Sequence, residues 1–106
     1  MEATAAEIVK YMENSYFAVS VIFCNEFYEI CKRFGVDYNV VREGWIADPR
    51  ISPTHSLVFE DKRGFDGKCL PKDVAAIIAA SEKAGFSPTL LRAALEANKK
   101  LKGWLK

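Results

Sequence analysis

The sequence predicts an all-α domain built from one long N-terminal helix and several shorter helices. Neither glycine nor proline occurs from Thr4 to Phe34, and these two residues most often interrupt a helix. No segment shows the sustained alternation of apolar and polar residues that is typical of a strand with one buried face. Because 106 residues is the size of one ordinary domain, we expect a single helical domain spanning residues 1–106.

The long helix is expected to bury one face along most of its length. Thr4 and Glu7 fit a capping box at its start, and Gly35 is placed to end it. Apolar residues spaced three and four apart form the predicted buried stripe, which consists of Ala5, Ile8, Met12, Tyr16, Val19, Phe23, Phe27, Ile30 and Phe34. A second apolar set lies on roughly the opposite side: Phe17, Val21, Cys24 and Tyr28. A small domain rarely covers one helix on every side, so we expect part of this surface to meet a second copy in a homodimer.

The chain after the long helix is expected to form a short helix and then a long loop. Asp37 is a candidate N-cap for a helix that ends near Trp45 or Ala47. Between Ser52 and Leu70 neither the helical nor the strand period holds, and Glu60 to Gly64 is expected to be exposed loop. A structureless loop of this length inside a compact domain is usually functional or disordered.

Two further helices are expected in the C-terminal third of the chain. Pro71 suits the first position of a helix, because the N–H that proline lacks is not needed there. Asp73 adds negative charge to the first turn, where the helix dipole favours it. This helix is predicted to run to Ala84 and to stop at Gly85, and Ser87-Pro88 is predicted to start a last helix that reaches the C-terminus.

Charge and hydropathy argue against two classes of partner. The formal net charge is +1 and the pI is about 7.7, so we expect no nucleic-acid partner. The longest mostly apolar stretch, Tyr16 to Cys24, is far shorter than the roughly 20 residues that cross a bilayer, so we expect no membrane partner. The acidic start of the chain lacks the basic and apolar regions of a secretory signal, and the predicted location is therefore cytoplasmic.

The cysteines are expected to be reduced thiols. There are three, and an odd number without an export signal does not indicate a disulfide framework. Cys24 and Cys31 fall on the predicted long helix and are expected to be small core residues. No CxxC pair occurs and His55 is the single histidine, so we expect no metal site.

Cys69 is a candidate nucleophile on local features alone. It follows a glycine-containing loop and precedes Pro71 at a predicted helix start. The helix dipole and the neighbouring Lys68 and Lys72 would favour the thiolate there. A small residue packed at a helix start would give the same local pattern, and these features do not separate the two interpretations. If the thiol is activated, Cys69 should be the most reactive of the three cysteines.

Four short motifs in order carry a resemblance to a known family. Gly64 to Asp73 is similar to a GxGGxCxPKD signature, and Asp48 to Ile51 is similar to a DPRI segment. Ala6 to Asn14 resembles AExxKxxxN, and Asn25-Glu26 resembles a following NE pair. Together these motifs resemble the central domain of the UDP-glucose/GDP-mannose dehydrogenase family. The resemblance implies a helical fold similar to the C-terminal domain of 6-phosphogluconate dehydrogenase.

The resemblance also implies a reaction and a set of catalytic residues. In the family, the C6 alcohol of a nucleotide sugar is oxidised twice, through a thiohemiacetal and then a thioester on a cysteine, and two NAD molecules accept the hydrides. Cys69 matches that nucleophile, and Lys10 matches a lysine that stabilises the oxyanion or moves protons. Asn14 matches its helical neighbour, and Asp73 matches the carboxylate that orients water. From spacing alone, a solvated helix face is favoured over a catalytic pair for Lys10 and Asn14.

The resemblance further implies a set of substrate-binding residues. Arg50 matches an arginine that reaches substrate, in some members across a subunit interface, although it equally fits an arginine that ties a loop to a helix end. Gly64, Phe65 and Gly67 match the loop that approaches the sugar closely. Asp66 departs from the pattern, because a glycine is usual there, and this side chain puts the conformation of the loop in doubt.

The cofactor and partners implied by the resemblance lie largely outside this chain. No GxGxxG follows a predicted strand, so we expect no cofactor to be bound by this chain alone. The family's dinucleotide-binding and C-terminal nucleotide-binding domains are absent from the sequence. NAD, a UDP-sugar such as UDP-glucose, and a separate NAD-binding chain are the implied partners of a complete enzyme, and the isolated chain is predicted to be inactive. The alternative is a free-standing helical dimerisation module without catalysis.

Overall fold

A computed structural model describes residues 2–66 and 70–103 of the chain. These residues form α1 (Ala3–Arg33), α2 (Tyr38–Ile46), α3 (Leu70–Lys83) and α4 (Thr89–Lys102). Within the described ranges no strand occurs, and one isolated β-bridge pairs Phe59 with Lys62. The predicted all-α class, with one long N-terminal helix and shorter helices after it, is confirmed.

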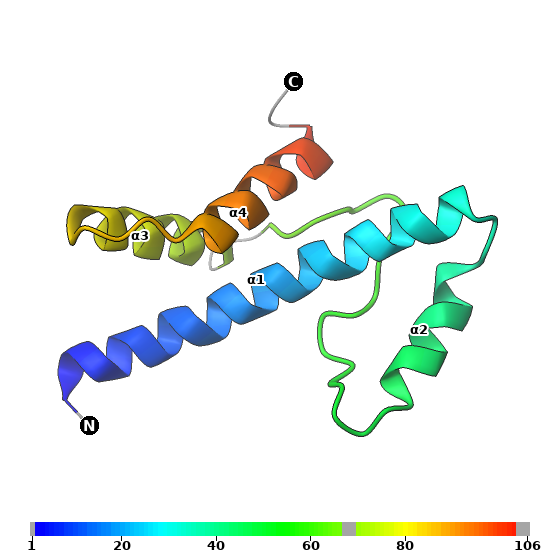
Figure 1. Ribbon diagram of the computed structural model, residues 1–106, viewed down its shortest axis with the longest axis horizontal. Coiled ribbons are helices and arrows are strands. Elements are labelled where there is room, and N and C mark those ends of the chain that lie inside the picture. Colours follow the sequence, from blue (N-terminus) through cyan, green and yellow to red (C-terminus); the bar gives the residue numbers. More distant parts are fainter. Residues whose placement is uncertain (1, 67–69, 104–106) are drawn as a thin grey trace.

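Helix α1 forms the axis of the domain (Figure 1). Helices α3 and α4 lie along one side of it, and α2 folds back on the other side, near the C-terminal end of α1 (Figure 1). The loop after α2 crosses α1 on its way to α3 (Figure 1). The domain measures 46 × 38 × 23 Å, and its smallest dimension is only about two helix diameters.

Most helix boundaries follow from glycine and capping residues. Helix α1 ends before Gly35, whose φ of 68° suits a residue without a side chain. Asp37 caps α2, because its carboxylate accepts a hydrogen bond from the backbone N–H of Asn39 at 2.9 Å. The capping box predicted for Thr4 and Glu7 is wrong: α1 already begins at Ala3, and no side chain caps it.

Two apolar clusters lie on different sides of α1. The first joins the middle of α1 to α3, α4 and the loop, and its buried members are Ala18, Val21, Ile22, Phe65, Val74, Ile78 and Ala94. The second joins the C-terminal half of α1 to α2 through Cys24, Cys31 and Tyr38. Cys24 and Cys31 are 2% and 6% exposed, which confirms that both are core residues.

The predicted buried stripe on α1 is wrong for the single chain. Met12, Tyr16 and Phe34 are 74%, 65% and 79% exposed, and Ile8, Phe23, Phe27 and Ile30 are also exposed. The cores use other residues of α1 instead, because α3, α4 and the loop pack on one side of the helix and α2 packs on the other. Periodicity identified the two faces of the helix but could not show which one the rest of the domain would cover.

The described part of α1 is long but interrupted by polar residues. None of the described helices has both the length and the apolar content that a membrane span requires.

Candidate active site

Two predicted catalytic residues meet between α1 and α3. The side-chain amide of Asn14 donates a hydrogen bond to Asp73 Oδ2 at 2.7 Å. Asp73 lies in the first turn of α3 and is 6% exposed, and Asn14 is half-buried. A buried carboxylate without a partner would be costly, so this bond satisfies Asp73 and also fixes its orientation.

Lys10 lies one helical turn before Asn14 on α1. Its side chain is exposed, and its ammonium lies 5.6 Å from the centre of the Tyr11 ring. Residues four apart on a helix share a face, so Lys10 lies on the same face of α1 as Asn14, which contacts Asp73.

A cleft with a volume of about 420 Å³ lies between the middle of α1 and the loop before α3. Asp66 and Leu70, which flank residues 67–69 in the sequence, both line it, together with Asn25, His55 and Lys62. The predicted nucleophile Cys69 and the predicted substrate contact Gly67 lie outside the described residues.

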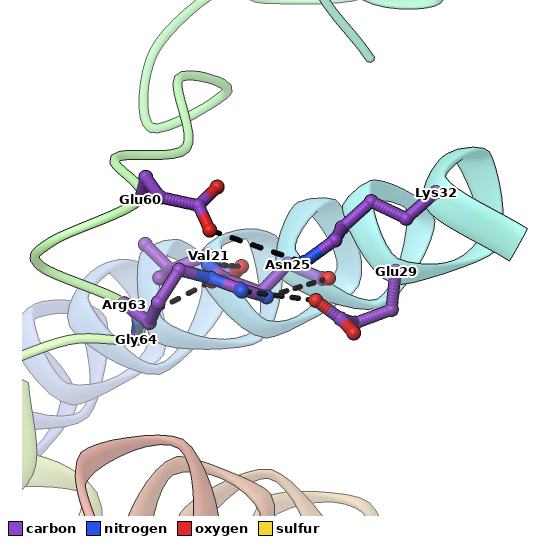
Figure 2. Close-up of polar contacts among 7 residues, drawn as sticks. All are labelled: Val21, Asn25, Glu29, Lys32, Glu60, Arg63 and Gly64. Atoms are coloured by element: carbon purple, nitrogen blue, oxygen red, sulfur yellow. Dashed lines mark hydrogen bonds and ion pairs between the residues drawn. The ribbon is translucent and has the colours of Figure 1, made fainter. Parts of the chain in front are cut away.

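Arg63 anchors the start of the predicted substrate loop on α1 (Figure 2). Its Nε donates to Asn25 Oδ1 at 2.6 Å, and its guanidinium also donates to Glu29 Oε2 at 3.0 Å. The guanidinium carbon lies 4.5 Å from the centre of the Tyr28 ring, a cation–π distance. The hydrogen bond from Arg63 lowers the pKa of the Glu29 carboxyl. The expected exposed loop from Glu60 to Gly64 is therefore wrong at Arg63, whose side chain is only 15% exposed.

Gly64 and Phe65 lie between α1 and α4. The backbone N–H of Gly64 donates to Asn25 Oδ1 at 3.3 Å, and that of Phe65 donates to Asn98 Oδ1 at 2.6 Å. The amide of Asn98 in turn donates to the Phe65 carbonyl at 2.8 Å. The Phe65 ring is 3% exposed and belongs to the first core cluster. The structure thus places both predicted substrate contacts at an anchoring point of the loop.

Asp66, the departure from the family pattern, is paired with α4. Its Oδ2 lies 2.9 Å from the ammonium of Lys102, and its Oδ1 lies 4.0 Å from that of Lys62. The hydrogen bond from Lys102 lowers the pKa of the Asp66 carboxyl. The side chain is therefore directed to the helix rather than left unpaired in the loop.

Arg50 follows α2 and is bound to its own loop. It donates to both carboxylate oxygens of Asp48, at 3.0 and 2.7 Å, and its side chain is 86% exposed. These bonds lower the pKa of the Asp48 carboxyl. The structure does not bring Arg50 together with Asn14 and Asp73, and it shows the contacts of an arginine that ties a loop to a helix end.

Cys24 has the environment of an unreactive thiol. It is 2% exposed, and burial is the main cause that raises its pKa. A raised pKa leaves less thiolate at neutral pH, and the thiolate is the nucleophilic form. Slow alkylation is therefore expected for Cys24, against which the reactivity of Cys69 can be compared.

Sequence analysis missed Asn98 and underestimated Arg63 and Asn25. Asn98 is 0% exposed and follows Ala94, another buried residue, by one turn of α4. Its place on the apolar face of the helix was the available signal. An amide on such a face is expected to be buried, and a buried amide needs hydrogen-bond partners. Arg63 gave no such signal, since its partners lie 34 and 38 positions away in the sequence.

Comparison with known proteins assigns this helical domain to a family of nucleotide-sugar dehydrogenases. Residues 4–100 match the central domain of the UDP-glucose/GDP-mannose dehydrogenase family, and the chain belongs to that family. It is 42% identical over 93 residues to the UDP-glucose 6-dehydrogenase AglM of Haloferax volcanii, which covers 88% of this chain and 21% of that protein.

Bacterial relatives match the same region. The UDP-glucose 6-dehydrogenase of Pseudomonas aeruginosa is 38% identical over 97 residues, covering 92% of this chain and 21% of the relative. TuaD of Bacillus subtilis, also a UDP-glucose 6-dehydrogenase, is 34% identical over 96 residues. The match covers 91% of this chain and 20% of TuaD. This chain therefore spans about a fifth of the length of these relatives.

Replacing Arg63 with methionine is expected to lower the free energy of unfolding by about 2 to 3 kcal/mol. Methionine keeps the apolar stem but removes the donors to Asn25 and Glu29, and hydrogen bonds to charged groups contribute about 1.5–3 kcal/mol each. Urea unfolding followed by circular dichroism measures the change. Lys62→Met is the matched control: Lys62 is 68% exposed, and its loss should cost less than about 0.5 kcal/mol. Equal losses for the two variants would show that Arg63 is not an anchor.

Proposed function

We propose that this chain is the central domain of an NAD-dependent UDP-glucose 6-dehydrogenase, and that it supplies the Cys69 nucleophile and a dimer interface. The hydrogen bond between Asn14 and Asp73 carries the proposal, because it joins two predicted catalytic residues that are 59 positions apart in the sequence. The names of the relatives, all UDP-glucose 6-dehydrogenases, support the choice of substrate.

The proposed chemistry assigns a separate task to each residue. The thiolate of Cys69 adds to the C6 aldehyde of the sugar and forms a thiohemiacetal, whose oxyanion the ammonium of Lys10 stabilises. Transfer of hydride from that carbon to NAD, which another domain or chain would hold, would give a thioester. Water then attacks the thioester carbonyl, the C–S bond breaks, and the carboxylate and the free thiol are released. Asp73, oriented by Asn14, accepts a hydrogen bond from that water and directs it toward the carbonyl.

The described residues do not fit NAD. They form four helices without a strand, whereas dinucleotides bind at a Gly-rich turn between a strand and a helix. The described residues of this chain are therefore assigned no part in binding NAD. In the proposed enzyme NAD and most of the nucleotide are bound by another domain or chain, which presents the acceptor to the sugar beside Cys69.

The test is NADH formation from UDP-glucose in three samples. The chain alone is expected to give none, and the chain mixed with a separately supplied dinucleotide-binding domain is expected to give activity. A chimera in which residues 4–100 replace the matching segment of the Pseudomonas aeruginosa relative removes any dependence on association between separate chains. A folded chimera without activity would overturn the catalytic proposal and leave the dimerisation module as the function.

The exposed apolar stripe on α1 supports the proposed dimer interface. Light scattering at high micromolar concentration is expected to give the mass of two chains. Tyr16→Glu combined with Phe27→Glu should yield a monomer of unchanged helicity, because these side chains are 65% and 41% exposed in the single chain and cost little to alter there. Leu57→Glu, at a residue that is 51% exposed but outside the stripe, should leave the dimer intact. A stable wild-type monomer would contradict the proposal.

A further inference from the structure

Asn98 satisfies the whole backbone hydrogen-bonding capacity of Phe65. Its Oδ1 accepts from the Phe65 N–H at 2.6 Å and its Nδ2 donates to the Phe65 carbonyl at 2.8 Å. Asn98 is 0% exposed, so water cannot replace either bond. The fit is close, since a Cβ on Gly64 would lie 2.4 Å from Asn98 Oδ1. Because hydrogen bonds require narrow ranges of distance and angle, these two bonds hold the Phe65 backbone in place against α4.

Lys102 makes a second contact from the same face of α4. It lies one helical turn after Asn98, and its side chain is only 11% exposed. Its ammonium lies 2.9 Å from Asp66 Oδ2. Two neighbouring residues of the loop, Phe65 and Asp66, are thus bound by two side chains on one helix face, and on the other side Asn25 binds Gly64 from α1.

We propose that Asn98 and Lys102 are positioning residues, which fix the Gly64–Asp66 segment from α4 and so set the point from which the chain continues to Cys69. This inference rests on the proposed function, because the position of the loop matters for catalysis only if Cys69 is the nucleophile. The Phe65 N–H is bonded to Asn98, and the Gly64 N–H is bonded to Asn25 on α1. Both groups therefore serve as anchors of the loop.

The pair formed by Asp66 and Lys102 is the part of this arrangement that depends on the departure from the family signature. A glycine at position 66 offers no partner for Lys102. With aspartate, the loop gains a charged contact to α4 that a glycine-containing loop lacks. The same pair is open to a charge-reversal test, which separates an ion-pair effect from simple loss of packing.

The experiment measures amide hydrogen exchange and thiol alkylation in the 106-residue chain. In Asn98→Asp the donor to the Phe65 carbonyl is replaced by an oxygen that repels this carbonyl and pushes the loop away from α4. Exchange at the Phe65 amide is therefore expected to rise roughly ten- to a hundredfold, which corresponds to the loss of one buried hydrogen bond. The Val74 amide, in a residue that is 0% exposed, is the internal reference and should change less. Lys102→Met should raise Phe65 exchange severalfold, and the matched control Lys100→Met should not.

Alkylation of Cys69 across pH supplies a readout that folding alone would not change. Both variants are expected to slow it severalfold at neutral pH, because a thiol displaced relative to the start of α3 would lose the stabilisation of its thiolate by the helix dipole. In the charge-reversal series, Asp66→Lys with Lys102→Asp should restore the alkylation rate relative to either single change. If Asn98→Asp does not fold, the Lys102 series carries the test.

The outcomes separate this inference from the proposed function. Wild-type values of Phe65 exchange and Cys69 alkylation in the Lys102 and Asn98 variants would overturn the positioning role, as would a double reversal no better than the single ones. Changed alkylation together with a chimera that forms no NADH would support the positioning role and overturn the catalytic proposal instead.

Discussion

Replacing Cys69 with serine in the active chimera is expected to reduce steady-state NADH formation by a factor on the order of a thousand or more. A hydroxyl has a far higher pKa than a thiol and is a weaker nucleophile at neutral pH. The aldehyde from the first oxidation would then have no thiohemiacetal through which to undergo the second. The expected progress curve therefore stops near one NADH per sugar at most, where the wild type yields two.

Cys24→Ala is the control for this substitution. Cys24 is buried in the second apolar cluster, away from the proposed chemistry, so its loss should lower stability modestly and leave the rate constant of the folded enzyme unchanged. NADH absorbance, with sugar products identified by mass spectrometry, distinguishes the two variants. Full turnover by Cys69→Ser would remove Cys69 from the mechanism.

Replacing Gly64 with alanine is expected to lower the free energy of unfolding by about 3 kcal/mol or more. Gly64 has a φ of 77°, and a left-handed conformation costs a residue with a side chain roughly 1–2 kcal/mol. The new Cβ would lie 2.4 Å from Asn98 Oδ1, so Asn98 must move. Its displacement leaves buried groups of Phe65 unpaired, at about 1–3 kcal/mol each. Urea or thermal unfolding measures the sum.

Gly44→Ala is a matched control in the same chain. Gly44 lies inside α2 and has no atom within 4 Å of the position that a Cβ would occupy. Alanine is better than glycine in a helix interior by about 0.8–1 kcal/mol, so this variant is expected to be more stable than the wild type. A Gly64→Ala variant as stable as the wild type would show that the close contact with Asn98 is not maintained in solution.

The sequence was sufficient for features that depend on one or two neighbouring residues. Gly35, Asp37 and Gly85 mark helix boundaries through backbone geometry and local hydrogen bonds, and the structure confirms those boundaries. The start of α1 was wrong because Thr4 and Glu7 fit a capping motif that the chain does not use. A sequence that fits a capping motif does not have to form it, and the first residue of a helix can differ from the predicted one by one or two positions.

Features that depend on distant partners could not be predicted in this way. Asn14 and Asp73 were linked by family resemblance, and their hydrogen bond spans 59 positions. Arg63 had the composition of an exposed charged loop, and only the approach of Asn25 and Tyr28 explains its burial. Asn98 had no charge or motif to distinguish it. The deciding contacts are set by the packing of α1 against α3 for Asn14 and Asp73, and by the packing of the loop against α1 and α4 for Arg63 and Asn98.

A single turn of α1, from Val21 to Asn25, belongs to several parts of the domain at once. Val21 and Ile22 pack in the first cluster, Cys24 packs in the second, and Asn25 binds the loop. Loosening this turn would therefore weaken both cores and the loop anchor together. In thermodynamic terms, the shared turn makes independent melting of α2, or of the loop, from the rest of the domain unfavourable, and the chain is expected to unfold as one cooperative unit.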